Sequence, residues 1–156
     1  GRFKMNPPLR SAEDRQALIA GIQDGTIDMI ATDHAPHSQE EKSRGLEKSA
    51  FGIVGIETAF PLLYTYLVET GKMPLEMLID RMADAPRRRF RIDSGMQVGD
   101  KAAVTVFDLH AQEKIDPNTF LSKGHATPFE GREVHAACRL TICGDKIAYN
   151  ALSRKE

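Results

Sequence analysis

The chain has no tryptophan, only two cysteines, and no apolar run long enough to cross a lipid bilayer. Cys138 and Cys143 are five positions apart, so on one strand the alternation of side chains would place them on opposite faces. A disulfide is therefore not expected, and the cysteines require no oxidising compartment. The net charge of −1 gives no field that favours nucleic acid or a membrane surface. We therefore expect a cytoplasmic protein that binds neither nucleic acid nor a membrane.

The remaining composition is typical of a folded protein, with 41% hydrophobic and 28% charged residues. The 156 residues suffice for one compact domain or two small ones. The chain opens on Gly1-Arg2-Phe3-Lys4 rather than on methionine, and we interpret it as a fragment of a longer protein. The arginines of residues 87–91 are interpreted as the cationic end of a short helix. The charges of Glu40-Glu41-Lys42 are interpreted as part of a solvated loop.

The first part of the chain carries helical signals around one short strand. Ser11 followed by Asp14 forms a shorter version of a capping box, and Gly25 can end a helix, so a helix is predicted over 12–24. The apolar residues 27–31 predict a buried strand. A polar loop follows from 32 to about 52, and loops of that length usually carry function.

Helices and then strands are predicted for the rest of the chain. An apolar stripe over 56–68 predicts a helix that ends at Gly71, with Pro61 tolerated near its first turn. Pro74 occupies the first position of a second helix, and a short third helix restarts at 84–86. After Gly95, β-rich runs predict strands at 103–107, 133–142 and 146–149, with a hairpin turn at 144–145. This order predicts an α/β unit at 1–94 and a β-sandwich segment at 95–156.

The stretch ATDHAPH, residues 31–37, places Asp33, His34 and His37 directly after the predicted strand. In α/β folds, functional groups gather at the carboxyl ends of strands. A carboxylate at that position can bind a divalent metal or act as a general base towards water. The same residues also occur in solvated polar loops. Composition and spacing leave both interpretations open.

Four segments give the chain a family resemblance. They are KMNPPLR at 4–10, ATDHAPH at 31–37, EKSAFGIVGIET at 47–58, and Ser122-Lys123 followed by TPFEG at 127–131. With these segments, the chain resembles the C-terminal part of the bacterial-type (class I) dihydroorotases of the amidohydrolase superfamily. The resemblance implies an α/β fold that comprises the C-terminal part of a metal-dependent (β/α)8 TIM barrel and part of a small β-sandwich domain. It also implies interconversion of dihydroorotate and N-carbamoyl-L-aspartate in pyrimidine biosynthesis.

The resemblance further implies a role for each matching residue. Asp33 would be a metal ligand and also the catalytic general base, which moves a proton from the attacking water to the leaving amide nitrogen. His34 would be structural. The substrate would be contacted by the side chains of Asn6 and His37. It would also be contacted by backbone groups of Phe51 and Gly52.

The chain lacks the His-x-His pair with which enzymes of this kind hold their metals. The implied cofactor is zinc, one or two ions per complete site. A catalytic zinc needs about three protein ligands, whereas the motif supplies only Asp33. We therefore expect the isolated chain to be inactive and the remainder of the same polypeptide to be its first partner.

Other partners and functions stay open at this point. Besides the small-molecule substrate, the partners considered are a second copy of the protein in a homodimer and aspartate carbamoyltransferase. One alternative function is that of a hydantoinase or allantoinase relative, which opens another cyclic amide. The other is an inactive dihydroorotase-like scaffold that supports aspartate carbamoyltransferase.

Overall fold

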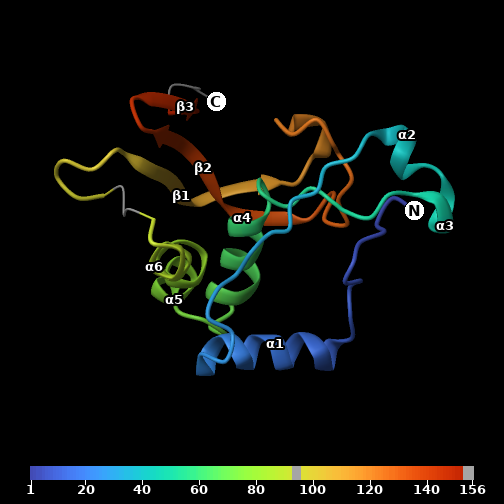
Figure 1. The fold of residues 1–156 in the computed structure, drawn as a ribbon, viewed down its shortest axis with the longest axis horizontal. Helices are drawn as coiled ribbons and strands as arrows, with labels where there is room; N and C mark the ends of the chain where they lie inside the picture. The colour runs from blue at the N-terminus through green and yellow to red at the C-terminus, as the bar shows by residue number, and fades with distance from the viewer. Residues whose placement is uncertain (93–95, 153–156) are drawn as a thin grey trace.

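The computed structural model describes residues 1–92 and 96–152. The described residues form helices and an antiparallel sheet, and the fold is therefore of mixed α and β type. Figure 1 shows α1 (Ala12–Asp24) on one side of the sheet, with the helical residues 59–68 between the two. Helices α2 (Gln39–Lys42) and α3 (Gly45–Lys48) lie with the N-terminus at one end of the molecule. Gly95, the predicted boundary between two domains, lies outside the described residues, so the division into 1–94 and 95–156 stays a prediction.

Helix α1 confirms the helix predicted over 12–24. The Ser11 hydroxyl accepts a hydrogen bond from the Asp14 N–H at 3.2 Å, and the Asp14 carboxylate accepts one from the Ser11 N–H at 3.3 Å. Gly25 ends the helix with φ 85°, in the left-handed region that favours glycine. Of the predicted apolar stripe, Ile19 is buried whereas Leu18 is 54% exposed. The caps therefore set the ends of α1, and its apolar face is only partly covered.

The strand predicted for residues 27–31 is wrong. Its backbone bonds are isolated: the Ile27 N–H donates to the Gly21 carbonyl at 2.8 Å, and the Ile30 N–H donates to the Arg81 carbonyl at 2.9 Å. A strand requires a ladder of bonds to a second strand, and within the described residues no strand lies beside this segment. The apolar pattern correctly indicated a partly buried segment. It could not indicate whether a second strand lies beside that segment.

The polar loop predicted after residue 32 contains two short helices. Helix α2 begins at a capping box, in which Ser38 accepts from the Glu41 N–H and Glu41 accepts from the Ser38 N–H. Helix α3 follows after two residues. The interpretation of Glu40-Glu41-Lys42 as solvated is wrong for Lys42, which is only 5% exposed. This burial is the main departure of the loop from its sequence pattern.

Two helical stretches follow the loop. The first consists of α4 (Ala59–Leu63) and the π-helix η1 (Tyr64–Val68), so it begins at Ala59 rather than at Ile56, which is 64% exposed. The second runs without a break through α5 (Leu75–Ile79), the π-helix η2 (Asp80–Asp84) and α6 (Ala85–Phe90). Helix α6 confirms the short third helix predicted from 84–86, with Pro86 in its first turn, where proline is tolerated, although it follows η2 directly.

The sheet confirms the three predicted strands and extends each of them. They are β1 (Ala103–Lys114), β2 (Glu133–Cys143) and β3 (Lys146–Asn150), paired antiparallel in the order β1-β2-β3. Cys143 pairs with Lys146 around Gly144, whose φ is 64°, and this confirms the predicted hairpin. Both cysteines are free thiols.

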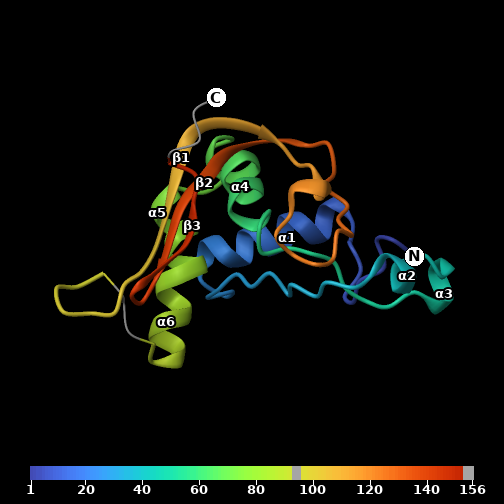
Figure 2. The same ribbon diagram turned by 90° about the horizontal axis from the view of Figure 1, so that it is seen from above.

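The helices pack on the sheet through a small number of specific contacts. The rings of Phe60 on α4 and Phe107 on β1 stack with centroids 4.1 Å apart. The His135 N–H on β2 donates to the Thr65 hydroxyl on η1 at 2.8 Å. Figure 2 shows β1 and β2 curving together past α4. Within the described residues, none of the helices combines the length and apolarity needed to cross a membrane.

Candidate functional site

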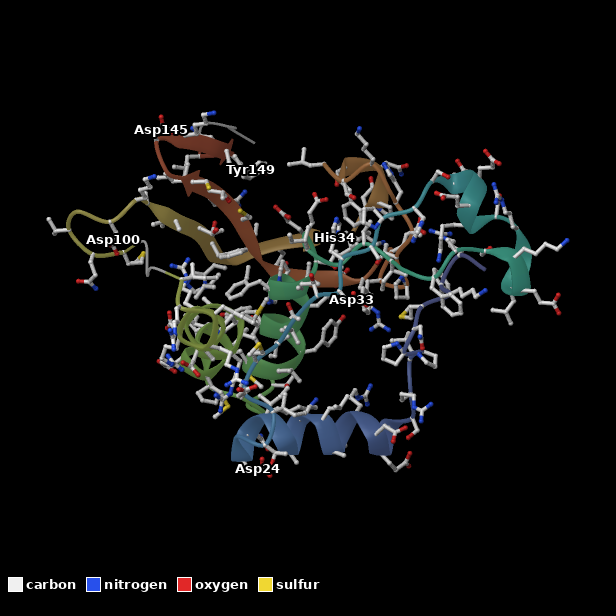
Figure 3. All side chains as sticks on the ribbon, viewed as in Figure 1. Asp24, Asp33, His34, Asp100, Asp145 and Tyr149 are labelled. Carbon is white, nitrogen blue, oxygen red and sulfur yellow. The ribbon has the colours of Figure 1, made fainter. Side chains whose placement is uncertain are left out.

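Residues 31–37 run through the middle of the molecule, where Figure 3 labels Asp33 and His34. The Ala35 N–H donates to the Ile53 carbonyl at 2.9 Å, and His34 forms an isolated parallel bridge with Ile53. The next residue, Val54, donates its N–H to the Ala126 carbonyl at 3.0 Å. These bonds join ATDHAPH to the segment 47–58, and they attach that segment to the residue before TPFEG.

Two glycines allow the chain to approach ATDHAPH this closely. A Cβ on Gly52 would lie 2.6 Å from the Ala35 Cβ and 2.7 Å from the Ala35 carbonyl oxygen. A Cβ on Gly124 would lie 2.7 Å from the Pro36 Cβ and 2.8 Å from the His37 nitrogen. Neither position can hold a larger residue without moving the backbone. Gly52 is one of the predicted site residues, whereas no local feature of the sequence points to Gly124.

Asp33 has an uncommon backbone conformation and an available carboxylate. Its φ is 47°, in the left-handed region that few residues other than glycine adopt, although aspartate is one of the better tolerated. The side chain is exposed. Within the described part of the chain, its carboxylate has neither a hydrogen-bond nor an ion-pair partner. Asp33 is therefore free to accept a proton or to bind a cation.

His34 has a structural role in this fold. Its Nδ1 accepts hydrogen bonds from the backbone N–H of Gly55 at 3.0 Å and of Ile56 at 3.3 Å. A ring nitrogen that accepts carries no proton, so the neutral ring holds its proton on Nε2. The Nδ1 atom is therefore unavailable to a metal, which agrees with the structural role that the family resemblance implies.

His37, Phe51 and Gly52 lie together. The His37 Nε2 lies 2.8 Å from the Phe51 carbonyl oxygen and must donate its proton to it. The other ring nitrogen, Nδ1, lies 3.7 Å from the Glu41 carboxylate. Phe51 is 57% exposed, so much of this residue remains accessible. The structure thus brings together three of the four residues predicted to contact substrate.

The fourth, Asn6, is exposed on the N-terminal arm and reaches this group through the backbone. The Lys4 carbonyl, two residues earlier, accepts a hydrogen bond from the Gly52 N–H at 3.0 Å. The Lys4 ammonium lies 4.2 Å from the centroid of the Phe51 ring, within the range of a cation–π interaction. The arm that carries Asn6 is therefore fixed to the Phe51-Gly52 segment.

Two charged groups beside the site have shifted pKa values. Hydrogen bonds from the Ser38 backbone and hydroxyl lower the pKa of Glu41, because they stabilise its ionised form; nearby His37 acts in the same direction. Burial lowers the pKa of Lys42, because it disfavours the ammonium ion, and the neighbouring positive charge of Lys4 adds to this effect.

The described residues do not form a complete metal site. No group of three or more His, Cys, Asp or Glu side chains gathers in them in a way that could hold an ion. Asp33 is available, but His34 Nδ1 accepts from the backbone and His37 Nε2 donates to Phe51. Because a catalytic zinc needs about three protein ligands, the donor set of this chain does not fit zinc by itself.

Among solved structures, the chain is similar to cyclic-amide hydrolases. Against an L-hydantoinase (dihydropyrimidinase) from Arthrobacter aurescens, the TM-score is 0.86 at 32% identity, over 97% of this chain and 35% of that one. Against a D-hydantoinase (dihydropyrimidinase) from Thermus sp., the TM-score is 0.85 at 26% identity, over 96% of this chain and 34% of that one. The chain therefore shares its fold with a part of these enzymes.

Among curated proteins, the chain is similar to dihydroorotases, although no protein-family model matches it. The dihydroorotase of Anoxybacillus flavithermus is 57% identical over 148 residues, and that of Brevibacillus brevis is 55% identical over 148 residues. Both alignments cover 94% of this chain and 35% of the relative. The resemblance found in the sequence is thereby confirmed: over nearly its whole length, this chain is homologous to a segment of the dihydroorotases that makes up about 35% of those proteins.

Proposed function

We propose that this chain is the C-terminal part of a dihydroorotase, an enzyme that interconverts dihydroorotate and N-carbamoyl-L-aspartate. The observation that carries the proposal is the 57% identity to a dihydroorotase across 94% of the chain. The unpaired carboxylate of Asp33, next to the cluster of His37, Phe51 and Gly52, supports it with chemistry suited to opening a cyclic amide.

In this proposal, residues 1–94 belong to the last part of a (β/α)8 barrel and residues 95–156 to a small β-sandwich. The similarity to hydantoinase structures supports such an architecture. The segment 27–31 would then become a barrel strand when neighbouring strands from the rest of the polypeptide pair with it. Asp33 would follow at its carboxyl end, where functional residues of barrels gather.

Asp33 is the proposed general base. During hydrolysis it would take a proton from the water that attacks the ring carbonyl and then deliver that proton to the leaving amide nitrogen. It would also be one ligand of zinc, whose remaining ligands must come from outside the described residues. When bound, zinc would polarise the scissile carbonyl.

Asn6, His37, Phe51 and Gly52 are the proposed substrate contacts. The Gly52 N–H already donates to Lys4, and the carbonyls of Phe51 and Gly52 already accept hydrogen bonds. Each carbonyl keeps a second lone pair that can accept from a ring N–H of the substrate. His37, beside this edge, suits the anionic carboxylate of dihydroorotate.

The partners that we propose are the small-molecule substrate and the remainder of the polypeptide, in the cytoplasm. A homodimer or a complex with aspartate carbamoyltransferase remains a further proposal. An inactive scaffold is disfavoured, because Asp33, Asn6 and His37 are all present. A hydantoinase or allantoinase relative is the second candidate, favoured by the structural similarity at 32% identity.

A ring-opening assay of the complete polypeptide against dihydroorotate, hydantoin and allantoin separates these candidates. We expect dihydroorotate to give the highest kcat/KM, and the reverse cyclisation of N-carbamoyl-L-aspartate to occur as well. Faster opening of hydantoin or allantoin would reject the dihydroorotase assignment in favour of the relative. Complete inactivity in the zinc-loaded protein would favour the scaffold.

A further inference from the structure

The Lys42 ammonium lies at the centre of a group of backbone carbonyls. Its Nζ donates hydrogen bonds to the carbonyl oxygens of Lys4, Ala50 and Gly52, each at 2.8 Å. An ammonium group has three N–H donors, so these three bonds use its full capacity. With the residue only 5% exposed, the bonds replace water that the buried charge would otherwise need.

The residues around Lys42 are fixed as well. The Lys42 carbonyl accepts from the hydroxyl of Ser49, a residue that is 3% exposed. The backbone N–H of Ala50 donates to the Glu41 carbonyl at 3.2 Å. These bonds fix the backbone of α2 from which the Lys42 side chain extends, and the three carbonyl contacts fix its ammonium.

The three carbonyls belong to the two segments that carry most of the proposed substrate contacts. Lys4 precedes Asn6 by two residues, and Ala50 and Gly52 flank Phe51. One nitrogen atom thus ties the N-terminal arm to the Phe51-Gly52 turn. Lys4 and Gly52, which are 48 positions apart in the sequence, are also joined by the hydrogen bond from the Gly52 N–H to the Lys4 carbonyl.

We propose that Lys42 is a positioning residue of the substrate site, which sets the conformation of the Asn6 arm and the Phe51-Gly52 turn through the three backbone carbonyls. It touches no reacting atom. This inference rests on the proposed function for its kinetic consequence, but the carbonyl contacts can be tested without any substrate.

The test compares Lys42→Met with Lys48→Met in the complete polypeptide. Methionine keeps an unbranched apolar stem but has no donor, whereas Lys48 is an exposed lysine on α3 and provides the matched control. We expect Lys42→Met to speed hydrogen exchange at the Gly52 amide by at least about tenfold and to raise the KM for dihydroorotate by at least about tenfold, with a smaller fall in kcat. Lys48→Met should change neither quantity.

Lys42→Arg provides a second variant that retains the buried positive charge, in case Lys42→Met does not fold. A planar guanidinium spreads its donors and cannot place three carbonyl oxygens 2.8 Å from one nitrogen, so we expect KM to rise at least about threefold. Wild-type values of KM and of Gly52 exchange in Lys42→Arg would overturn the positioning role.

The two proposals fail in different ways. If the parent protein does not turn over dihydroorotate, the proposed function fails, and the Gly52 exchange rates still decide whether Lys42 fixes the turn. If the parent is active and Lys42→Met has the parent's exchange rate and KM, the positioning role fails alone.

Discussion

Asp33 combines an uncommon backbone conformation with a carboxylate that no described residue engages. Such conformations cost free energy and persist where the surrounding structure enforces them, often at functional sites. Here the enforcement comes from the bonds that fix the residues after it, including the Ala35 N–H to Ile53 carbonyl bond. The proposed general-base role therefore rests on one side chain, and replacing that side chain should impair the chemistry but not the fold.

We expect Asp33→Asn in the complete polypeptide to lower turnover by at least 10²-fold, roughly the range for loss of a general base. Asparagine tolerates the left-handed region as aspartate does, so folding should be retained. Steady-state rates with dihydroorotate and thermal unfolding measure the two effects. Asp28→Asn, at an exposed carboxylate in the preceding segment, is the control. A variant that keeps more than about a tenth of the parent rate would show that Asp33 is not the base.

His37→Ala should act on binding. Loss of a charge-assisted hydrogen bond to the substrate costs roughly 1.5–3 kcal/mol, so we expect KM to rise about 10- to 100-fold with a smaller fall in kcat. Zinc content should not change, because His37 Nε2 donates to the Phe51 carbonyl and is not assigned as a ligand. Elemental analysis decides the point: a variant that purifies with less zinc than the parent would make His37 a ligand.

At the scale of single residues, the sequence predicts those site residues that stand next to one another in a contiguous motif. Asp33, His34 and His37 were visible because they stand together, and the structure agrees that His34 is structural. The burial of Lys42 could not be predicted from the sequence, because its three acceptors lie on segments that only the tertiary fold brings together.

At the scale of elements, local sequence signals predicted the ends of helices and hairpins well, but they predicted the pairing of strands poorly. Helix α1 was found from Ser11 and Gly25, and the β2–β3 hairpin from Gly144, because capping and turn chemistry act within a few residues. The strand predicted at 27–31 failed because a strand exists only with a partner. The π-helical turns of η1 and η2 left no recognisable pattern, because their side-chain spacing is close to that of an α-helix.

The loop around ATDHAPH should tolerate no side chain at Gly52. We expect Gly52→Ala to destabilise the protein by about 2–4 kcal/mol, because a positive φ and an overpacked contact each cost roughly 1–2 kcal/mol or more. Gly45→Ala is the matched control, with a φ of 76° but open space around its Cβ, and should show the backbone cost alone. Denaturant unfolding of both variants tests this. Equal losses would mean that the approach of Ala35 to Gly52 is unimportant.

We expect helix α2 to lose stability at low pH. The Ser38 N–H and hydroxyl lower the pKa of Glu41, so Glu41 contributes stability that is present above its unfolded value of 4.5 and is lost as pH falls through the lower folded value. We expect the Glu41 Cδ resonance to titrate below pH 4.5, together with faster exchange at the Glu41 amide. Glu41→Gln should remove this acid transition. A Glu41 titration at or above 4.5 would contradict the capping contribution.

At the scale of the whole molecule, the described residues leave large apolar side chains exposed over several elements. Leu18 on α1, Leu46 on α3 and Phe90 on α6 are all more than half exposed. Helix α1 lies apart from the sheet in Figure 1 and buries only Ile19. Exposed apolar surface on this scale marks either a contact surface or a tendency to aggregate. Because the chain corresponds to about 35% of its relatives, we propose that the rest of the polypeptide covers these faces.

The 156-residue chain alone should therefore bind no zinc tightly and hydrolyse nothing. Its motif supplies one ligand where a catalytic zinc needs about three, and its apolar faces lack the strands and helices that would bury them. Zinc titration and a dihydroorotate assay of the isolated chain test this directly. Mixing it with a separately produced fragment that carries the rest of the polypeptide should restore both zinc binding and activity. The same mixture made with the Asp33→Asn chain should assemble but stay inactive, which separates assembly from chemistry. Turnover by the isolated chain above the metal-free background would mean that the site is complete within these residues.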